Sequence, residues 1–179
     1  MKCFQLVLLY LLLSFVAIGQ SIDTSFTIKT IKKYGYTVKI PNWLKVDGGS
    51  AEDINFTPKV FKENPYLILI LSSFKSKYSN LEQFKGVYLK DSYAKDEINS
   101  YYLSKNIINV SHVGSTILGD EYKVKYKKNY LDQSTICDEE LVFRETKNAY
   151  LCILYIPPRD KFDLNIDKFM VFLQGISIQ

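Results

Sequence analysis

The clearest alternation of apolar and polar residues lies in the second half of the chain, between positions 121 and 128. Every second residue there is large and apolar, and most residues between them are lysines, which is the period of a strand with one buried face. The apolar residues are Tyr122, Val124 and Tyr126. Two further runs of strand type follow at 136–145 and 149–156, each preceded by turn-forming residues. The pattern predicts three successive antiparallel strands, around which the rest of the sheet is built.

Five further strand patterns precede this meander. They span 26–32, 36–40, 54–56, 66–74 and 107–112. In the second of them, Tyr36, Val38 and Ile40 share one face, and Pro41 ends the strand because it lacks an amide hydrogen. The run at 66–74 is almost continuously apolar, which is typical of a central strand that is buried on both faces.

Two stretches carry the period of amphipathic helices. The sequence Ser-Asn-Leu-Glu that begins at Ser79 has the spacing of a capping box, and the helix after it is expected to run to about Tyr93. The last helix, 165–174, has apolar residues at i, i+3, i+4 and i+7 and ends at Gly175. These residues are Ile166, Phe169, Met170 and Leu173. A further helical piece is expected at 96–103.

The order of these elements resembles that of the PsbP-like superfamily. The resemblance rests on a strand that begins Gly35-Tyr36 and ends at Pro41, on the capped helix, the meander, and a last helix that ends Phe-Met-Val-Phe-Leu-Gln-Gly-Ile. It covers about 25–179 and implies an α+β fold, a single-domain α/β/α sandwich with a central, mostly antiparallel β-sheet flanked by helices. Members mostly serve as accessory or assembly factors, so the resemblance implies no catalytic residue and no photosynthetic role.

Residues 1–19 have the character of a signal peptide. Lys2 is followed by an apolar run that is short for a membrane span, and small residues precede Gln20, where we expect cleavage. Retention of the segment as an anchor stays open. Residues 20–179 then form one PsbP-like α+β domain of an exported protein, periplasmic or secreted, without a stable membrane span after cleavage.

The charge balance gives little reason to expect a nucleic-acid partner. The chain has 23 Lys+Arg and 19 Asp+Glu, and removal of Lys2 leaves 22 against 19, a net charge of +3. The basic residues are dispersed except at Lys123–Lys128. That basic strand face is expected to keep the strand soluble, with an anionic partner as the alternative.

Few residues form a pattern that indicates chemistry. His112 is the only histidine, which excludes a two-histidine metal site. Asp138 and Glu140, in the run Asp138-Glu139-Glu140, share a strand face and have a spacing that could suit Ca²⁺ or a paired-carboxylate hydrolase. We expect them instead to pair with the lysines of the neighbouring strand. No cofactor, metal site or catalytic residue is predicted, and the binding residues stay unknown.

Cys137 and Cys152 are expected to be free thiols. A two-residue loop at Lys147-Asn148 would place Cys152 opposite Phe143, too far from Cys137 for a disulfide.

The function hypothesis is an exported, non-enzymatic accessory or protein-binding module whose partner is another envelope or secreted protein. The alternative is a binder of a small apolar ligand or lipid in an aromatic-lined groove, suggested by 14 Tyr and 11 Phe. Trp43, the only tryptophan, is expected to plug the core, with carbohydrate stacking as the rival interpretation. A hydrolase comes third, and the oligomeric state stays open.

Overall fold

The computed structural model describes residues 26–50, 52–60, 66–90, 92–93, 104–129, 134–158 and 163–179. The strands are β1 (Phe26–Ile31), β2 (Tyr36–Pro41), β3 (Leu44–Gly49), β4 (Asp53–Pro58), β5 (Leu67–Phe74), β6 (Ser92–Tyr93), β7 (Ser104–Thr116), β8 (Gly119–Asn129), β9 (Ser134–Glu145), β10 (Ala149–Ile156) and β11 (Ile176–Ile178). The helices are α2 (Leu81–Tyr88) and α3 (Ile166–Gln174), with short 3₁₀ turns at Lys32–Tyr34 and Lys75–Lys77.

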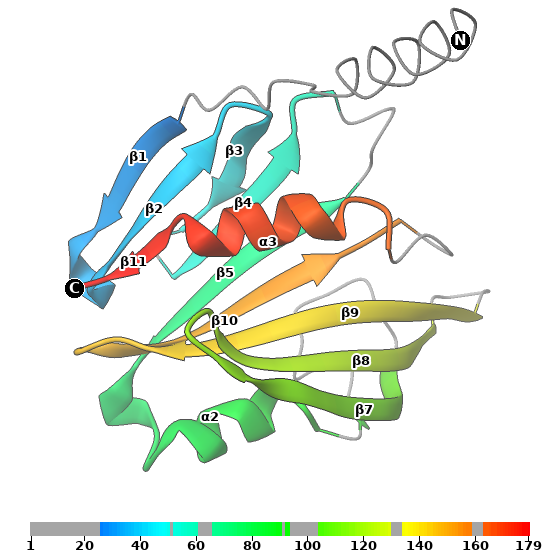
Figure 1. Ribbon diagram of the computed structural model, residues 1–179. Helices are drawn as coiled ribbons and strands as arrows, with labels where there is room; N and C mark the ends of the chain where they lie inside the picture. Colours follow the sequence, from blue (N-terminus) through cyan, green and yellow to red (C-terminus); the bar gives the residue numbers. More distant parts are fainter. Residues whose placement is uncertain are drawn as a thin grey trace, which may run out of the picture.

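The strands form two antiparallel sheets (Figure 1). The larger has eight strands in the order β3-β4-β5-β10-β9-β8-β7-β6, and the smaller has three in the order β1-β2-β11. The meander predicted from the alternating pattern is confirmed as β8, β9 and β10, which are neighbours in the larger sheet. The apolar run at 66–74 becomes β5, which lies between β4 and β10 as a central strand.

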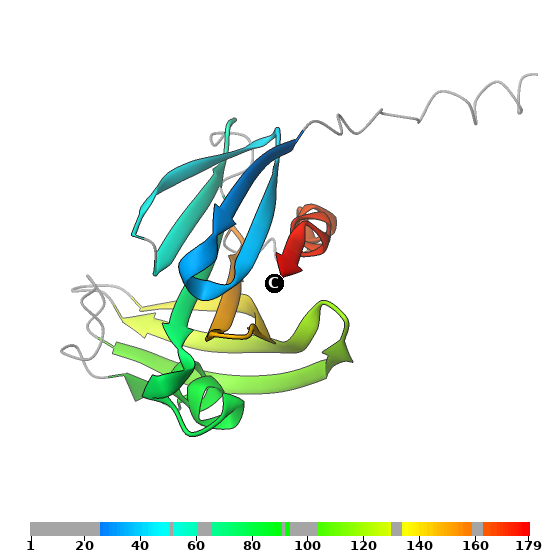
Figure 2. The ribbon, with the colours of Figure 1, turned by 90° about the vertical axis from the view of Figure 1, so that its left-hand side faces the viewer.

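The larger sheet is covered on both faces at β10, so this strand is buried along almost its whole length. Leu151 and Ile153 belong to one hydrophobic cluster, with β2 and α3, while Cys152 and Leu154 belong to a second cluster, with Phe84 of α2. The small sheet and α3 therefore cover one face, and α2 covers part of the other (Figure 2).

The last helix packs as its apolar period predicted. Phe169, Phe172 and Leu173 are buried, and the ring of Phe169 stacks on Tyr155 with centroids 5.2 Å apart. Gly175 ends the helix where the backbone turns against β2. A Cβ at this position would lie 2.7 Å from the Lys39 carbonyl oxygen, so only glycine allows this close approach.

The cap of α2 lies one residue later than predicted. Asn80 is the N-cap, and its side chain accepts a hydrogen bond from the Gln83 amide at 2.9 Å. Gln83 in turn accepts a hydrogen bond from the Ser79 amide. Asn80 and Gln83 therefore make the two capping hydrogen bonds that the sequence pattern predicted for Ser79 and Glu82. The helix ends at Tyr88 and not near Tyr93.

The predicted α/β/α sandwich is wrong. Within the described residues the fold is mainly β, and its α-helices have only 8 and 9 residues. One face of the central sheet is covered largely by the three-stranded sheet, because Tyr36, Val38 and Ile40 of β2 point into the core that a helical layer was expected to fill. The expected helix at 96–103 and the signal segment 1–19 lie outside the described residues. No helix in the described part of the chain is long and apolar enough to cross a membrane.

Candidate functional site

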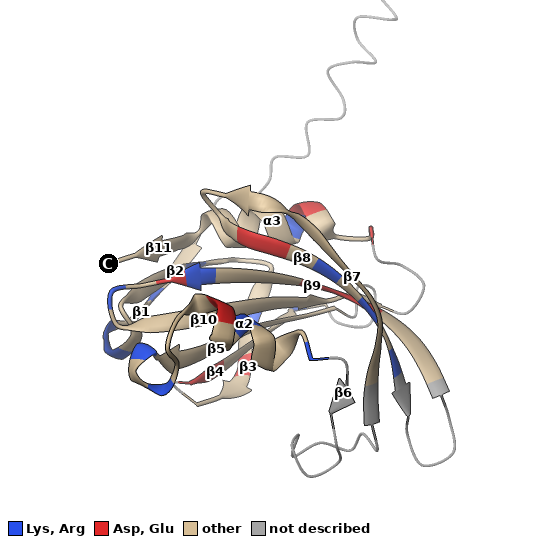
Figure 3. Cartoon of the chain, turned by 90° about the horizontal axis from the view of Figure 1, so that it is seen from below, with Lys and Arg blue, Asp and Glu red and all other residues tan. Residues whose placement is uncertain are grey.

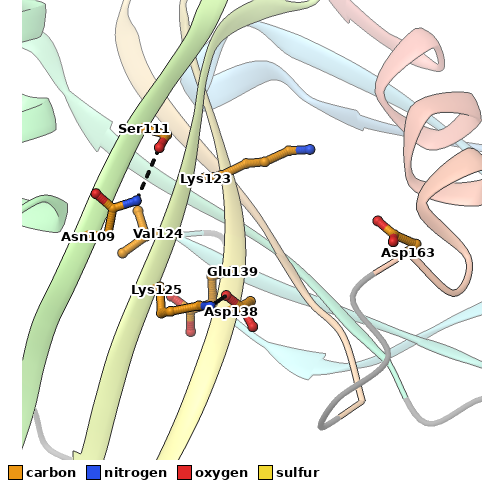
Figure 4. Close-up of a pocket in the computed structure, with 8 residues that line it drawn as sticks. All are labelled: Asn109, Ser111, Lys123, Val124, Lys125, Asp138, Glu139 and Asp163. Atoms are coloured by element: carbon orange, nitrogen blue, oxygen red, sulfur yellow. Dashed lines mark hydrogen bonds and ion pairs between the residues drawn. The ribbon is translucent and has the colours of Figure 1, made fainter.

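A polar pocket lies on the face of β7, β8 and β9 that continues from the side covered by α3 (Figure 4). Its volume is about 260 Å³. Residues of the three strands and one residue of the turn before α3 line it. They are Asn109, Ser111, Lys123, Val124, Lys125, Asp138, Glu139 and Asp163. No aromatic side chain is among them, so this pocket does not provide the aromatic-lined groove of the apolar-ligand alternative.

The strand register explains how the lysines and acids meet. Lys125 lies opposite Asp138 on β9, and their charged atoms are 3.8 Å apart. Lys123 lies opposite Glu140 on β9 and opposite Ser111 on β7. Basic and acidic positions therefore occupy neighbouring strands, as Figure 3 shows. The expectation that the acids of β9 pair with the lysines of β8 is confirmed at Lys125 and Asp138.

Glu140 differs from its neighbours because it is almost fully buried, with a relative exposure of 1%. Neither of its carboxylate oxygens has a hydrogen-bond partner in the described part of the structure. Burial, and then the negative charge of Glu121, raise the pKa of Glu140 to about 7, and the positive charge of Lys123 opposes them. A protonated Glu140 can donate to the Glu121 carboxylate, which also favours the raised pKa.

A buried tyrosine opposite Glu140, and a second tyrosine that contacts the first, also carry polar atoms. Tyr155 lies opposite Glu140 in the β9–β10 ladder, and its hydroxyl donates to the Leu164 carbonyl oxygen. The Tyr66 ring lies 5.8 Å from that of Tyr155, and its buried hydroxyl has no hydrogen-bond partner among the described residues. Burial raises the pKa of Tyr66 to about 12, so this hydroxyl stays protonated and can donate as well as accept.

A second polar cluster lies on the opposite face, between α2 and the β7–β8 hairpin. Asp120 accepts hydrogen bonds from His112 at 2.6 Å, from Ser115 at 2.7 Å and from Tyr122 at 3.2 Å, and it also pairs with Lys85 of α2. Burial alone would raise the pKa of Asp120, but the bonds from Lys85, Ser115 and His112 outweigh it and hold that pKa well below its usual range.

This cluster has a structural role in the fold. His112 and Ser115 both bind the same oxygen of Asp120, so the imidazole does not bridge the serine and the acid as it does in a catalytic triad. The His112 ring stacks on Tyr122, with centroids 4.7 Å apart. The cluster attaches α2 to the hairpin through the pair Lys85–Asp120.

No protein-family model and no curated protein matches the sequence. Among solved structures, the chain is similar to cyanobacterial PsbP (CyanoP) from Synechocystis sp. PCC 6803, with a TM-score of 0.46 and 12% identity over 91% of this chain and 98% of that one. It is also similar to the Ran-binding protein Mog1p of Saccharomyces cerevisiae, with a TM-score of 0.47 and 9% identity over 86% and 95% of the two chains. The comparison thus finds a PsbP protein, the resemblance that the sequence predicted, and at this level it concerns the fold alone.

The acidic run of β9 is divided between the two faces of the sheet. Asp138 and Glu140 share one face, as expected, and Glu139 points to the opposite face, where it accepts a hydrogen bond from Tyr126. No group of three or more potential metal ligands occurs within the described residues. Trp43 is half-buried and packs against the core cluster, as a plug would.

Sequence reasoning missed the importance of Lys85 and Asp120, because 35 positions separate them and neither belongs to a motif. From the sequence, Glu140 could be recognised only as a member of an acidic run. One feature of the sequence does indicate its burial: Leu141, Val142 and Phe143 follow it directly, and such an apolar run is typical of a strand segment covered on both faces.

Proposed function

We propose that this protein is an exported, non-catalytic accessory module that binds another envelope or secreted protein through β7. The observation that carries the proposal is a concentration of exposed apolar residues on β7 and the turn after it. These residues are Ile108, Val110, Val113 and Ile117, whose exposed fractions are 54%, 38%, 52% and 93%. Single exposed apolar residues are ordinary on a protein surface, but four within ten positions favour a binding surface.

The backbone of β7 also supports this assignment. The strand pairs with β8 along its length, whereas β6 pairs with it only at Lys105 and Asn106. Beyond Asn106, the sheet order of the described residues places no strand on the outer side of β7. An extended segment of a partner could therefore add to this edge and satisfy its backbone groups.

Two irregularities limit how such a partner can pair. The β7–β8 register shifts between Ile107 and Asn109 and again between His112 and Gly114. Bulges of this kind hinder nonspecific strand pairing at a sheet edge, and they change the direction in which the side chains at the bulge point. We therefore expect a short pairing at 109–112, flanked by apolar contacts of Ile108 and Val113.

Site-specific crosslinking in the native envelope tests this surface. A photo-crosslinking residue at Val113 is expected to give a discrete adduct with one partner. The double substitution Ile108→Lys with Val110→Lys is expected to remove that adduct, because it places two charges in the apolar contact. The matched control is a probe at Val60, which is equally exposed at 57% but lies after β4. The same adduct from the probes at Val113 and Val60, or an adduct unaffected by the lysine substitutions, would show that β7 is not the docking edge.

Export is tested separately by the mass of the protein recovered from the envelope. The proposal expects a chain that begins at Gln20. A protein that retains residues 1–19 would contradict cleavage, and one found only in the cytoplasm would contradict export.

A further inference from the structure

We propose that the outer face of the small sheet docks on the surface of an anionic phospholipid bilayer. The small sheet consists of β1, β2 and β11, and its inner face packs in the core beside the larger sheet. The inference does not depend on the docking edge of β7, because β1 belongs to the other sheet and lies on the opposite side of the molecule (Figure 1). It rests on two exposed apolar side chains and on the positive charge of this sheet.

The strand register shows which side chains form the outer face. Val38 of β2 is buried in the core, so Lys39, the next residue, points outward. Ile28 of β1 lies directly opposite Lys39, and Phe26 lies opposite Pro41, so both apolar residues belong to the same outer face. Their exposed fractions are 64% for Ile28 and 45% for Phe26. An exposed lysine and two exposed apolar side chains therefore lie together on this face.

The small sheet, with the turn that joins β1 to β2, carries a positive charge. Its residues include four lysines and no Asp or Glu. The lysines are Lys29, Lys32, Lys33 and Lys39. Lys33 lies 3.6 Å from Glu52, whereas the other three form no ion pair with any described residue. Gln179 lies beside Gly35 at the start of β2, whereas Phe26 lies opposite the end of β2, so the terminal carboxylate is remote from the apolar side chains.

The neighbouring sequence does not reverse this charge. Asp23 is the only acidic residue before Asp47, and five lysines lie between these two positions. The undescribed positions that adjoin β1, β4 and α3 are 20–25, 61–65 and 159–162, and together they contain three basic and three acidic residues. The excess of positive charge therefore belongs to the small sheet itself.

The lysine-rich strand β8 suits an anionic surface less well. Lys125 lies 3.8 Å from Asp138, and Lys123 lies opposite Glu140 in the β8–β9 ladder. Acidic residues thus face the lysines across that ladder and offset their charge. The small sheet has no such acids, and it also provides the apolar side chains that enter the boundary between headgroups and acyl chains.

Two features favour a bilayer over a soluble anion or an acidic protein. A soluble anion would leave Phe26 and Ile28 in water, whereas a bilayer accepts apolar side chains and positive charges together. The apolar run Leu6–Val16 is also close to β1 in the sequence, with only positions 17–25 between them. At about 3.3 Å per extended residue, these positions span at most roughly 30 Å. The run that we expect to enter a membrane during export therefore brings β1 close to the same bilayer.

Co-sedimentation with lipid vesicles tests the proposal. All described strands and helices lie within residues 26–179, so a chain of residues 20–179 keeps both sheets. We expect this chain to bind vesicles with about 30% phosphatidylglycerol roughly tenfold more tightly than vesicles of phosphatidylcholine alone, because each lysine near an anionic surface contributes about fivefold. Sodium chloride at about 0.5 M should release the protein. Sodium phosphate that releases it far better than sodium chloride of equal ionic strength would identify a phosphate site instead and overturn the proposal.

Substitution of the apolar residues locates the docking face. The double variant Phe26→Ser with Ile28→Ser is expected to weaken vesicle binding about fivefold or more, because these side chains no longer enter the interface. The matched control is Val110→Ser with Val113→Ser, which removes two exposed apolar side chains from β7 and should leave vesicle binding unchanged. Equal weakening by both double variants would overturn the proposal.

Substitution of the lysines is an independent test that does not alter the apolar residues. Lys32→Gln with Lys39→Gln is expected to weaken binding to the anionic vesicles roughly tenfold or more, whereas Lys125→Gln with Lys127→Gln, on β8, should weaken it less than about threefold. All four of these lysines are exposed, so both variants should fold. Equal effects of the two lysine pairs, or equal binding of the unsubstituted protein to both kinds of vesicle, would overturn the proposal.

Discussion

Cys152 of β10 lies directly opposite Phe143 of β9, which places it six positions along the ladder from Cys137. Cys137 faces Tyr126 of β8 instead. Six residues of strand span roughly 20 Å, whereas a disulfide tolerates Cα separations of about 4.4 to 6.8 Å. Neither thiol forms a disulfide within the described structure, as the predicted register required.

We therefore expect two reactive thiols in each chain of residues 20–179 when it is denatured without reductant. A thiol titration measures this number directly. A monomer without reactive thiols would contradict the register of β9 and β10, and the native protein gives an internal check, because the fully buried Cys152 should react far more slowly than it does in denaturant.

The β-meander could be predicted from the sequence because its information is local. Alternation sets which face is buried, and the loop at Lys147-Asn148 fixes the pairing of β9 with β10. The covering layers could not be predicted in the same way. Phe26 and Ile28 form part of a regular strand pattern, yet both are exposed, because β1 lies at the edge of the small sheet.

The candidate site depends still more on distant parts of the chain. Lys123 and Asp138 could be placed on facing strands from their alternation, but the pocket also needs Asp163, which the chain brings back only after β10. The shift of the α2 cap has a local cause. Ser79 and Asn80 are both good N-cap residues, and the pattern alone did not distinguish them.

Phe169→Ala is expected to lower the free energy of unfolding by about 3 to 5 kcal/mol. The side chain is fully buried between the sheets and stacks on Tyr155, so its removal leaves a cavity that the rigid strands cannot fill. Chemical denaturation measures the change. Gln174→Ala, at an exposed position of the same helix, is the control and should change stability by less than about 0.5 kcal/mol. Equal effects of the two substitutions would mean that α3 is not packed as described.

Gly119→Ala and Gly86→Ala are expected to act in opposite directions. Gly119 has a φ of 134°, and a Cβ there would lie 2.7 Å from the Phe143 carbonyl oxygen, so alanine should destabilise the β7–β8 turn. Gly86 lies within α2 with nothing within 4 Å of its added Cβ, so alanine should stabilise the protein by about 0.5 to 1 kcal/mol. Thermal melts of both variants test the pair. A stabilised Gly119→Ala would refute the hairpin geometry.

Breaking the Lys85–Asp120 pair should cost more than removing both partners. Asp120→Asn leaves the buried ammonium of Lys85 without its carboxylate, and removal of one member of a buried pair typically costs about 3 to 5 kcal/mol. Because Lys85 also bonds Glu82, we expect the lower part of that range. The double variant Lys85→Met with Asp120→Asn should recover part of the loss. Additive losses in this double-mutant cycle would show that the two side chains are not coupled.

The pH dependence of stability should depend strongly on Glu140. Its pKa in the folded protein is about 7, against an ordinary value of 4.5, so the folded state holds this proton more tightly than the unfolded chain does. Between these two values, rising pH therefore removes stability, and the loss is complete once the pH exceeds the folded-state pKa. A difference of this size corresponds to roughly 3 to 3.5 kcal/mol.

Glu140→Gln keeps the shape of the protonated side chain and cannot ionise. The variant should match the native protein near pH 4.5 and exceed its stability by roughly 3 to 3.5 kcal/mol at pH 8, because it avoids the buried charge. Urea denaturation at a series of pH values measures the difference, with Asp167→Asn as a control whose stability should follow the native protein throughout. The stability gained by Glu140→Gln should grow between pH 5 and 7. If it did not, Glu140 would have to be ionised beside a favourable partner in the folded protein, and the description of Glu140 as a buried carboxyl group without a hydrogen-bond partner would be wrong.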